Sequence, residues 1–344
     1  RLYGPVEALK DDGPFGRNPH YVRLSPTGHS AKFTGLENEG FFGIGVKAGE
    51  SYRFSVWARG EGQKIKVELV NTASMGETQV MTSDVLPINS ADWKRYEITI
   101  TPKETFAKAH LRIFLETGGS VDLEHVSLFP VDTWKGRRNG LRKDLAQALA
   151  DTKPGVFRFP GGCIVEGTDL ATRYNWKNSV GPVENRPLNE NRWHYSFQHR
   201  LFPDYYQSYG MGFFELFQLA EDMGAEPLPV VSCGLACQFQ NNSEDAHVKV
   251  ADLGSYVQDA LDLIEFANGD YSDKSKQEAY AELENLRESD SQCCHTAKLI
   301  LESGQIDPEE KDSIGKTAFD IAVESGARKI GALLSGQDPE TDGL

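Results

Sequence analysis

The sequence has 344 residues, a length typical of about two domains, so neither a single small module nor a large multidomain assembly fits it well. Its 36 lysines and arginines stand against 51 aspartates and glutamates. The resulting net charge of −15 argues against nucleic-acid binding, which depends on positive charge. Hydrophobic residues at 39% are enough for packed cores. The mean hydropathy of −0.46 argues against a membrane-spanning segment, so we expect a soluble chain that binds no membrane.

Between about residues 30 and 130 apolar and polar side chains alternate, which is the pattern of half-buried β-strands. The alternating apolar sets are Tyr52, Phe54, Val56 and Ala58; Ile65, Val67 and Leu69; Tyr96, Ile98 and Ile100; Leu111, Ile113 and Leu115; and Val121, Leu123, Val126 and Leu128. Glycine-containing turns separate them at a spacing typical of sandwiches. We therefore predict a jelly-roll-like antiparallel β-sandwich as the first domain, residues 1–130. Trp57 and Phe42 are candidates for an exposed sugar-binding platform, with half-buried strand aromatics as an equal alternative.

From residue 141 onward the periodicity changes to helices that alternate with short apolar strands. The predicted order is a helix over 141–150, a strand over 156–159, a helix over 213–223 that ends at Gly224, a buried strand over 227–232 and a helix over 253–267. This order indicates parallel βα units, in which functional residues lie at the carboxyl ends of the strands.

Residues 271–344 show no strand pattern and are rich in charge. The run 298–304 is followed by Gly315-Lys316-Thr317-Ala318 and further helical segments, an order that resembles an ankyrin repeat. One and a half repeats would be marginal alone, so this segment should dock on something else and is a candidate site for a protein partner. A plain helical hairpin is the alternative interpretation.

Arg158 lies inside the predicted strand 156–159, immediately before the turn Pro160-Gly161-Gly162. A buried guanidinium is costly unless it meets a carboxylate, so we expect an acidic partner for Arg158 inside a barrel-like core. Further along, the polar loop 174–187 carries Trp176, an aromatic residue suited to a sugar platform.

Three ordered motifs in this region resemble the family 51 glycoside hydrolases, the α-L-arabinofuranosidases. They are RFPGGC starting at Arg158, RYNWKNSVGPVENRP starting at Arg173, and YGMGFFELFQLAEDMGAEPLPVVSCG starting at Tyr209. The sandwich resembles the carbohydrate-binding-type module that members of this family carry. The resemblance covers most of residues 20–270 and stops near Asp270, where a gene fusion, a frameshift or an assembly artefact could lie.

The resemblance implies a (β/α)8 TIM barrel that hydrolyses terminal α-L-arabinofuranosyl residues of plant polysaccharides with retention. Two glutamates, at the ends of the fourth and seventh strands, would perform this reaction. By family order the strands at 156–159 and 227–232 are the second and third, so both glutamates should follow residue 270, and we find neither there. Residues 131–270 are little more than half of the roughly 250 residues of a complete barrel. We therefore predict a partial barrel in this span and little or no catalytic activity.

By position in the family motifs, Arg158 would hydrogen-bond the missing nucleophile, Cys163 would line the sugar subsite, and Trp176 or Trp193 would face the sugar. Core packing is an equal alternative for both tryptophans.

Three other acidic positions near the expected site call for a different interpretation. Asn189-Glu190-Asn191 imitates the family's acid/base signature, but no apolar strand precedes it, and we interpret it as a solvated loop. Glu166 and Glu184 have no evident partner carboxylate, which favours loop or ion-pair roles.

The cysteines are an odd number in a long chain, unlike those of a disulfide-stapled small domain. They are Cys163, Cys233, Cys237, Cys293 and Cys294. Cys233 and Cys237 form a CxxxC pattern, a weak metal signal without a second pair, and we interpret them as buried apolar thiols. We expect no metal and no organic cofactor.

The predicted function is that of an arabinofuranosidase-type glycoside hydrolase whose partner is an arabinose-containing polysaccharide or oligosaccharide, in a chain that lacks both catalytic glutamates. The alternatives are a non-catalytic carbohydrate-binding protein and an ankyrin-type protein-interaction module. The family's substrates favour a secreted or periplasmic location. No leader pattern follows Arg1, as in a processed chain or a fragment, so the compartment stays open. Asn241-Asn242-Ser243 matches the acceptor pattern for N-glycosylation.

Overall fold

The computed structural model describes residues 1–26, 33–40, 42–72, 78–193, 206–239, 241 and 243–269. The predicted ankyrin-like segment 271–344 and the junction near Asp270 lie outside the described residues. The chain divides into two compact units, Arg1–Pro154 and Gly155–Leu344. Each unit has its own hydrophobic core.

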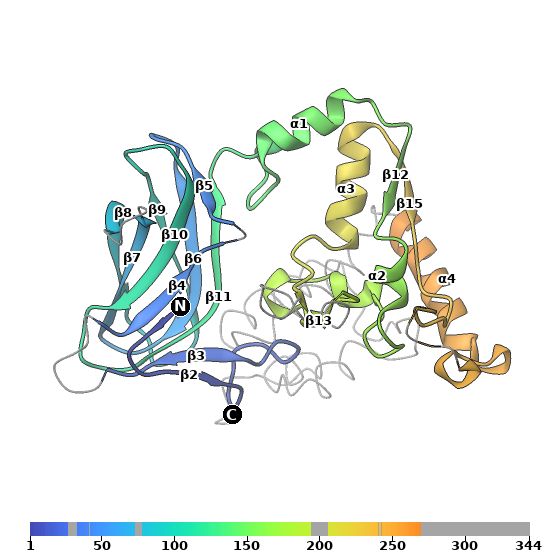
Figure 1. Cartoon of the computed structure of the whole chain (residues 1–344), viewed down its shortest axis with the longest axis horizontal. Helices are drawn as coiled ribbons and strands as arrows, with labels where there is room; N and C mark the ends of the chain where they lie inside the picture. Colours follow the sequence, from blue (N-terminus) through green and yellow to red (C-terminus); the bar gives the residue numbers. More distant parts are fainter. Residues whose placement is uncertain are drawn as a thin grey trace, which may run out of the picture. The chain divides into compact units, whose positions relative to one another are not determined.

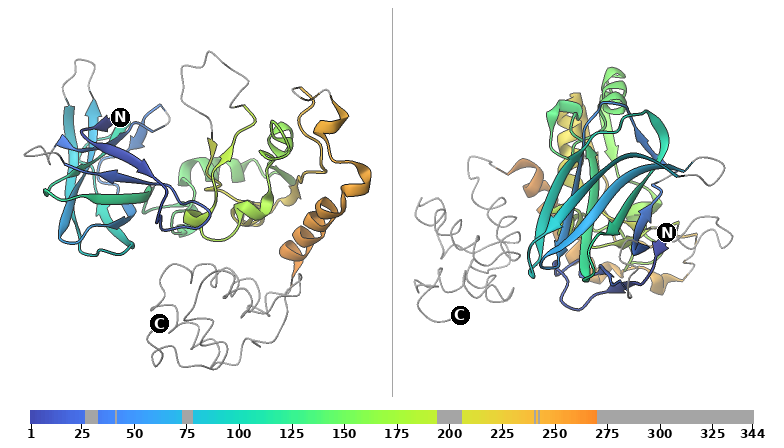
Figure 2. Two further views of the ribbon diagram at one scale, coloured as in Figure 1. Left: turned by 90° about the horizontal axis from the view of Figure 1, so that it is seen from below. Right: turned by 90° about the vertical axis from the view of Figure 1, so that its left-hand side faces the viewer.

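The first unit is an antiparallel β-sandwich of two sheets (Figures 1 and 2). One sheet has the order β1 (Leu2–Tyr3), β4 (Gly35–Asn38), β10 (Phe106–Leu115), β7 (Gln63–Thr72), β8 (Thr78–Ile88), with β5 (Ile44–Val46) also paired to β10. The other has the order β2 (Val6–Leu9), β3 (Tyr21–Leu24), β11 (Val121–Pro130), β6 (Tyr52–Arg59), β9 (Lys94–Ile100). Most connections from β5 to β11 cross between the sheets, as in jelly rolls. The predicted sandwich is therefore confirmed.

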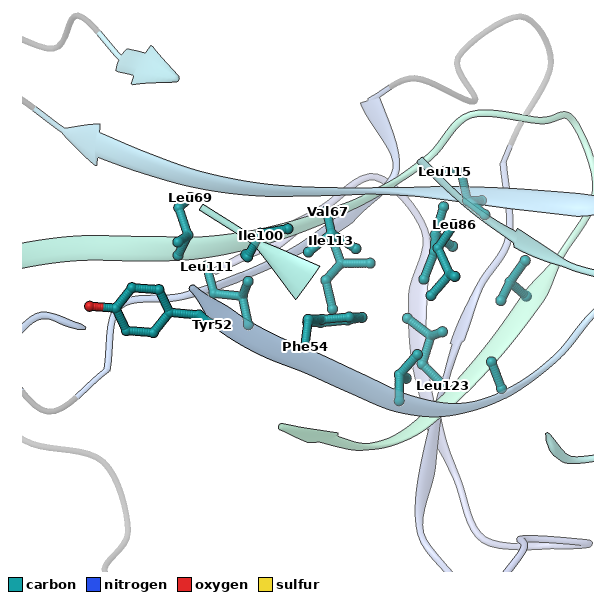
Figure 3. Packing of buried hydrophobic residues seen from close by; sticks show 14 of the residues in the cluster. Tyr52, Phe54, Val67, Leu69, Leu86, Ile100, Leu111, Ile113, Leu115 and Leu123 are labelled. Carbon is teal, nitrogen blue, oxygen red and sulfur yellow. The ribbon is translucent and has the colours of Figure 1, made fainter. Parts of the chain in front are cut away.

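Most of the residues that the period-two pattern placed on one face of each strand lie in the sandwich core, whereas Tyr96, Ile98 and Leu128 are only partly buried against it (Figure 3). Those buried between the sheets include Tyr52, Phe54, Val56, Ala58, Ile65, Val67, Leu69, Ile100, Leu111, Ile113, Leu115, Val121 and Leu123. Burying one such aliphatic or aromatic side chain contributes about 1.5–3 kcal/mol to folding. The core therefore accounts for the fold of this unit without any ligand.

β11 departs from simple alternation at a bulge between Glu124 and Ser127, where its pairing with β6 shifts register. His125 has a φ of 45° at this point. Val126, which the pattern placed in the core, is 39% exposed. The prediction for Val126 is wrong because this residue lies inside the bulge, where the alternation of side chains between the two faces is locally broken.

Two short elements follow the sandwich within the first unit. They are the 3-10 helix η2 (Trp134–Gly136) and the helix α1 (Lys143–Asp151), which confirms the helix predicted over 141–150. The indole Nε1 of Trp134 donates a 3.0 Å hydrogen bond to Oε1 of Gln147 and ties the two elements together.

The described part of the second unit contains a parallel pair of strands and three α-helices (Figure 1). Its main elements are β12 (Val156–Phe159), α2 (Cys163–Glu166), α3 (Phe213–Met223), β15 (Glu226–Pro229) and α4 (Gly254–Asn268). Its shorter elements are η3 (Trp176–Ser179), η4 (Val183–Asn185), β13 (Asn189–Glu190), β14 (Tyr206–Gln207), η5 (Glu244–Ala246) and η6 (Val250–Asp252). The parallel βα arrangement and the predicted helices over 213–223 and 253–267 are confirmed.

The two parallel strands are less buried than we predicted. Of the four residues of β12 only Phe159 is buried, and β15 is exposed along most of its length. The prediction of buried strands is therefore wrong for the described residues. The strands are exposed because the described part of this sheet has only two strands. Their apolar side chains are covered mainly where α3 packs against them. Among the described helices none is long and apolar enough to cross a membrane.

Candidate functional site

The loops that follow β12 and β15 meet at the carboxyl end of the strand pair. The amide of Val230 donates to the carbonyl of Phe159 at 2.7 Å, and the amide of Cys237 donates to the carbonyl of Gly167 at 3.3 Å. The side-chain amide of Asn241 donates to the carbonyls of Thr168 at 2.7 Å and Cys237 at 2.9 Å. These bonds fix the two loops as one edge, which is the position predicted for functional residues.

The same hydrogen bonds bear on the glycosylation pattern at Asn241. Both hydrogens of its Nδ2 atom are donated to backbone carbonyls. A glycan on that nitrogen would break at least one of these bonds, so the folded edge disfavours modification of Asn241.

Arg158 does not occupy the buried position that we predicted. Its side chain is exposed, and no carboxylate ion pair with it occurs among the described residues. The guanidinium lies over the turn that follows β12, since a Cβ added to Gly161 would come within 2.5 Å of Nη1 of Arg158. The predicted burial of Arg158 is therefore wrong, because the strand that carries it is itself exposed. Its acidic partner, expected after residue 270, stays a prediction. Gly161 has a φ of 81°, which also favours glycine there.

Cys163 begins α2 directly after this turn and lies beside a second cysteine. Atoms of Cys163, Glu166 and Cys237 that could bind a metal all lie within 4.8 Å of one another. Burial raises the pKa of the Cys163 thiol, and the neighbouring Cys237 and Glu166 raise it further, while Arg192 lowers it. Cys237 is fully buried, as predicted, whereas Cys233 is exposed and Cys163 is half-buried. The prediction of buried thiols is therefore right for Cys237 and wrong for Cys233.

Arg192, Trp193 and Phe239 form an aromatic and cationic group on the same unit. The guanidinium carbon of Arg192 lies 5.0 Å from the centre of the Trp193 ring and 5.7 Å from that of Phe239. Arg192 is 2% exposed, but Trp193 is 38% and Phe239 77% exposed. Exposed aromatic rings around a fixed polar group are a common way to bind a sugar, whose one face is apolar and whose hydroxyls need partners.

Trp176 lies in the core of the second unit. Its ring packs against Phe213 and Phe266, with centroids 6.0 Å and 5.4 Å away, and its Nε1 donates to the carbonyl of Asp259 at 2.9 Å. Only 6% of the residue is exposed. This position favours the core-packing interpretation of Trp176 over a role in facing the sugar.

The second and third motifs of the family resemblance are joined by an ion pair between the buried Arg186 and the half-buried Glu215. Nη1 and Nη2 of Arg186 donate to the two carboxylate oxygens of Glu215 at 3.0 Å and 2.8 Å. The same guanidinium donates to the carbonyls of Gly181 and Tyr209. Since Glu215 also accepts from the amide of Gly212 at 2.8 Å, the ion pair holds the 174–187 loop against the start of α3. Sequence reasoning missed this role of Glu215, because nothing in the local pattern identifies its partner.

The other acidic candidates, Glu190, Glu184 and Glu166, lie within short secondary-structure elements. Glu190 belongs to β13, which pairs with β14, and Asn191 is buried, so this segment is not the solvated loop that we predicted. Asn189 donates from Nδ2 to the carbonyl of Thr172 at 3.0 Å. Glu184 lies in η4 and Glu166 ends α2; both are half-buried.

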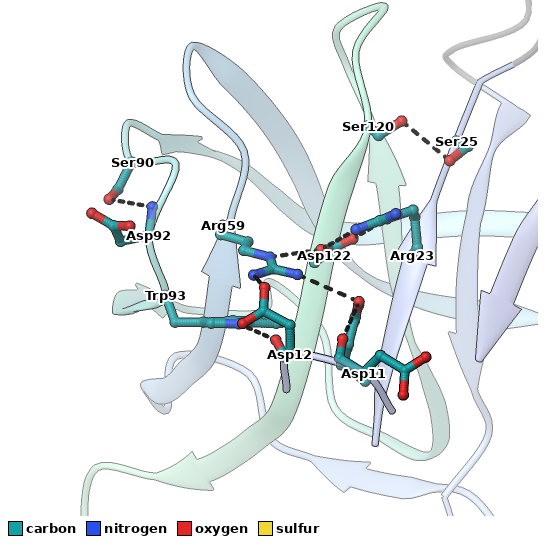
Figure 4. Close-up of polar contacts among 11 residues, drawn as sticks. Asp11, Asp12, Arg23, Ser25, Arg59, Ser90, Asp92, Trp93, Ser120 and Asp122 are labelled. Atoms are coloured by element: carbon teal, nitrogen blue, oxygen red, sulfur yellow. Dashed lines mark hydrogen bonds and ion pairs between the residues drawn. The ribbon is translucent and has the colours of Figure 1, made fainter. Parts of the chain in front are cut away.

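The sandwich carries a separate polar and aromatic cluster on the outer side of its second sheet (Figure 4). Asp122 accepts from Nε of Arg23 at 2.6 Å and from Nε of Arg59 at 2.8 Å. Arg59 also lies over the Trp93 ring, 4.8 Å from its centre. Asp122 is thus paired with both arginines, which accounts for the cluster by contacts within the sheet and gives no evidence of a ligand site.

Trp57 and Phe42, the predicted platform, lie on different parts of the sandwich. Trp57 is half-buried on β6, and Phe15 packs edge-on against it at 5.2 Å. Phe42 lies between β4 and β5 and is 64% exposed. The half-buried alternative therefore fits Trp57, and the described structure does not bring the two rings together.

Comparisons with known proteins agree with this division of the chain. A family model described as the alpha-L-arabinofuranosidase 1 domain matches residues 148–282, and one described as a carbohydrate binding domain matches residues 11–120. An extracellular exo-alpha-L-arabinofuranosidase of Streptomyces chartreusis is 37% identical over 284 residues, covering 79% of this chain and 31% of the relative. Alpha-L-arabinofuranosidase 1 of Arabidopsis thaliana is 36% identical over 239 residues, covering 69% of this chain and 32% of the relative.

A solved structure shows the same likeness. The arabinose-bound MgGH51 α-L-arabinofuranosidase has a TM-score of 0.68 and 26% identity, and the match covers 82% of this chain and 44% of that one. The chain spans about a third of the length of the curated relatives named above. The predicted combination of a carbohydrate-binding-type sandwich with part of an arabinofuranosidase-type domain is confirmed, whereas no finding supports the ankyrin resemblance.

Proposed function

We propose that this chain recognises terminal α-L-arabinofuranosyl residues of plant polysaccharides at the edge formed by the loops after β12 and β15. The match of residues 148–282 to the arabinofuranosidase domain supports the substrate class. The observation that carries the location is the group formed by the buried Arg192 and the exposed Trp193 and Phe239. Arg158, near the end of β12, and Cys163, at the start of α2, would line the same edge.

We propose further that the chain by itself turns over little or no substrate. Retaining hydrolysis needs two carboxyl groups about 5 to 5.5 Å apart, one as acid/base and one as nucleophile. Among the described residues, the carboxylate of Glu215 is held in an ion pair with Arg186. The catalytic glutamates of the family would each follow a buried strand, and neither Glu166 nor Glu190 does so. The chain would then bind the sugar that a glycoside hydrolase of this type recognises, without hydrolysing it.

The first test measures release of 4-nitrophenol from 4-nitrophenyl α-L-arabinofuranoside by the purified chain, beside an Arg158→Ala control. We expect no release above the control. Turnover that disappears in the control would show that a catalytic carboxylate pair exists within these residues, and would overturn the proposal of an inactive chain.

The second test measures binding of arabinan-derived oligosaccharides by isothermal titration calorimetry. Because each exposed aromatic ring contributes a stacking interaction, Trp193→Ala and Phe239→Ala should each weaken binding by roughly threefold to tenfold. Phe42→Ala, which removes an exposed ring from the sandwich, should leave the affinity unchanged. Unchanged binding in Trp193→Ala and Phe239→Ala would reject the proposed edge.

A non-catalytic binding function of the sandwich is the second candidate, because residues 11–120 match a carbohydrate binding domain. It predicts the opposite result in the same titration, namely loss of binding in Phe42→Ala. A protein partner for residues 271–344 stays a prediction, as does the secreted or periplasmic location.

A further inference from the structure

Three side chains with metal-binding atoms meet at the carboxyl edge of the strand pair, although they come from two separate loops. The thiol sulfurs of Cys163 and Cys237 and a carboxylate oxygen of Glu166 lie within 4.8 Å of one another. Cys237 is fully buried, and the other two residues are half-buried. It is the single such group among the residues that the structure describes.

The surrounding backbone holds these side chains in place. Cys163 and Glu166 lie at the two ends of the single-turn helix α2, which follows the turn after β12. Two hydrogen bonds fix the loop of Cys237 to the end of α2, from the Cys237 amide to Gly167 and from Asn241 to Thr168, and a third, from Asn241 to Cys237, closes the loop on itself. The cluster is therefore a consequence of the fold and not of one flexible side chain.

The chemistry of the three atoms selects a class of ligand. Two sulfurs and one carboxylate oxygen match the preferences of Zn²⁺ and similar thiophilic divalent cations, and do not suit Mg²⁺ or Ca²⁺, which take oxygen ligands. Tetrahedral Zn²⁺ with bonds of about 2.3 Å to sulfur and about 2.1 Å to oxygen places its donor atoms roughly 3.5–3.8 Å apart. Donor atoms already within 4.8 Å would reach this geometry by small side-chain movements.

The charge of the three side chains also favours a divalent cation. Two thiolates and a carboxylate carry three negative charges, and a divalent cation leaves one of them uncompensated. Burying the group with its cation is therefore far less costly than burying the three anions alone.

We propose that Cys163, Cys237 and Glu166 bind one thiophilic divalent cation of the Zn²⁺ class, with a fourth position open to water. Each thiol loses its proton when its sulfur binds the metal, so two protons are released for each cation bound. This site shares Cys163 with the proposed sugar-recognition edge, but it goes beyond sugar recognition and does not depend on it. The CxxxC spacing of Cys233 and Cys237 pointed to another pair, and the structure assigns Cys237 to Cys163 instead.

The test uses the full chain, reduced and freed of metal, in a background that carries Cys233→Ser, Cys293→Ser and Cys294→Ser. This background keeps only the two proposed cysteine ligands, so any thiolate signal reports on them. Co²⁺ is the probe, because its thiolate complexes show a charge-transfer band and visible d–d bands of tetrahedral type. We expect saturation at one equivalent of Co²⁺ and displacement of the bands by Zn²⁺.

Three variants in that background show which residues bind the metal. Cys163→Ser and Cys237→Ser should each abolish the two-sulfur spectrum. Glu166→Gln keeps both thiols and should weaken Co²⁺ binding by roughly tenfold or more, the scale on which even outer partners change metal affinity. Circular dichroism checks the fold, and if a cysteine variant does not fold, Glu166→Gln still decides the question.

Several outcomes would overturn the proposal. These are the absence of a charge-transfer band, the same band in Cys237→Ser, or unchanged affinity in Glu166→Gln. If the reduced chain does not bind Co²⁺ and loses two reactive thiols in air, Cys163 and Cys237 form a disulfide instead. Failure of sugar binding in the calorimetric titration would leave the Co²⁺ result unaffected, so the two proposals fail separately.

Discussion

Glu124 is a carboxylic acid placed where the sandwich gives it little water. It lies at the bulge of β11 and lines a cavity of about 190 Å³ beside His125, His20 and Tyr21. Its Oε1 accepts a hydrogen bond from Nδ2 of Asn18 at 2.7 Å. Burial disfavours the charged form and raises the pKa of Glu124 to about 8, and the bond from Asn18 opposes this shift only in part.

The raised pKa predicts that the stability of the sandwich falls as the pH rises. Between pH 4.5 and about 8 the folded protein keeps the proton on Glu124, whereas the unfolded chain has lost it. Stabilisation is therefore full below pH 4.5 and is lost as the pH approaches 8. Each unit of pKa difference corresponds to about 1.4 kcal/mol. Glu124→Gln should flatten this dependence and raise the melting temperature at pH 8.5, as measured by thermal denaturation from pH 5 to 8.5.

Glu61→Gln, which changes an exposed carboxylate in a turn, is the matched control and should retain the slope of the unmodified chain. Glu37 does not contribute to the change of stability between pH 5 and 8.5. Burial works to raise its pKa, but hydrogen bonds from Tyr3, His110 and Arg112 outweigh burial and lower the pKa to about 2. An equal slope in Glu124→Gln and the unmodified chain would show that Glu124 is not protonated at neutral pH.

Individual residues differ in how well the sequence predicts their surroundings. Phe54 and Val67 were correctly placed in the core, because strand alternation decides burial from neighbours two positions away. Arg158 and Trp176 were harder, since their surroundings depend on segments far away in the sequence. Trp176 meets Asp259 and Phe266, whereas the partner expected for Arg158 is absent from the described residues. Arg192 and Phe239 carried no local signal, and only the fold brings them together.

At the scale of elements, periodicity and turn chemistry were sufficient for the longer segments. Helix α3 was predicted almost residue by residue, because its apolar face ends at Gly224, which adopts a left-handed φ of 69°. The two-residue strands β13 and β14 and the bulge of β11 were not predicted, since an element of one or two residues has no period. β12 was located correctly, but its exposure was not, because burial of a parallel strand depends on neighbouring strands and helices.

The contact between η3 and α3 depends on the absence of a side chain at Gly212. A Cβ at this position would lie 1.6 Å from the carbonyl oxygen of Ser179, so the two backbones would have to move apart. Their approach allows the amide of Phe213 to donate to Oγ of Ser179 at 3.0 Å. Gly212→Ala should therefore destabilise the second unit by about 1–3 kcal/mol, the usual cost of overpacking.

Urea denaturation followed by tryptophan fluorescence measures this loss, since Trp176 lies in the adjoining core. Gly155→Ala is the control, because a Cβ there meets no atom within 4 Å. If Gly212→Ala unfolds at the same urea concentration as Gly155→Ala, the close approach of η3 and α3 contributes nothing to stability.

At the scale of the whole molecule, two surface properties act against each other. The net charge of −15 makes copies of the chain repel. α4, however, exposes Val257, Leu261 and Ile264, which are 57%, 53% and 60% exposed. These residues are spaced by four and three positions, so they form one apolar stripe along the helix. A contiguous apolar stripe on the surface favours association, and charge repulsion limits it.

This balance predicts that the chain associates when salt screens its charge. Raising the ionic strength from 0.01 M to 1 M shortens the Debye length from about 30 Å to about 3 Å, which removes most of the repulsion but leaves the apolar stripe unchanged. The mean mass by light scattering and the fluorescence of an apolar dye should therefore both rise with salt. Leu261→Glu with Ile264→Lys adds one charge of each sign, keeps the net charge at −15 and should suppress both effects. Val80→Gln, which removes a single exposed apolar residue from the sandwich, should behave like the unmodified chain. A salt-induced rise of equal size in the α4 variant would place the associating surface elsewhere.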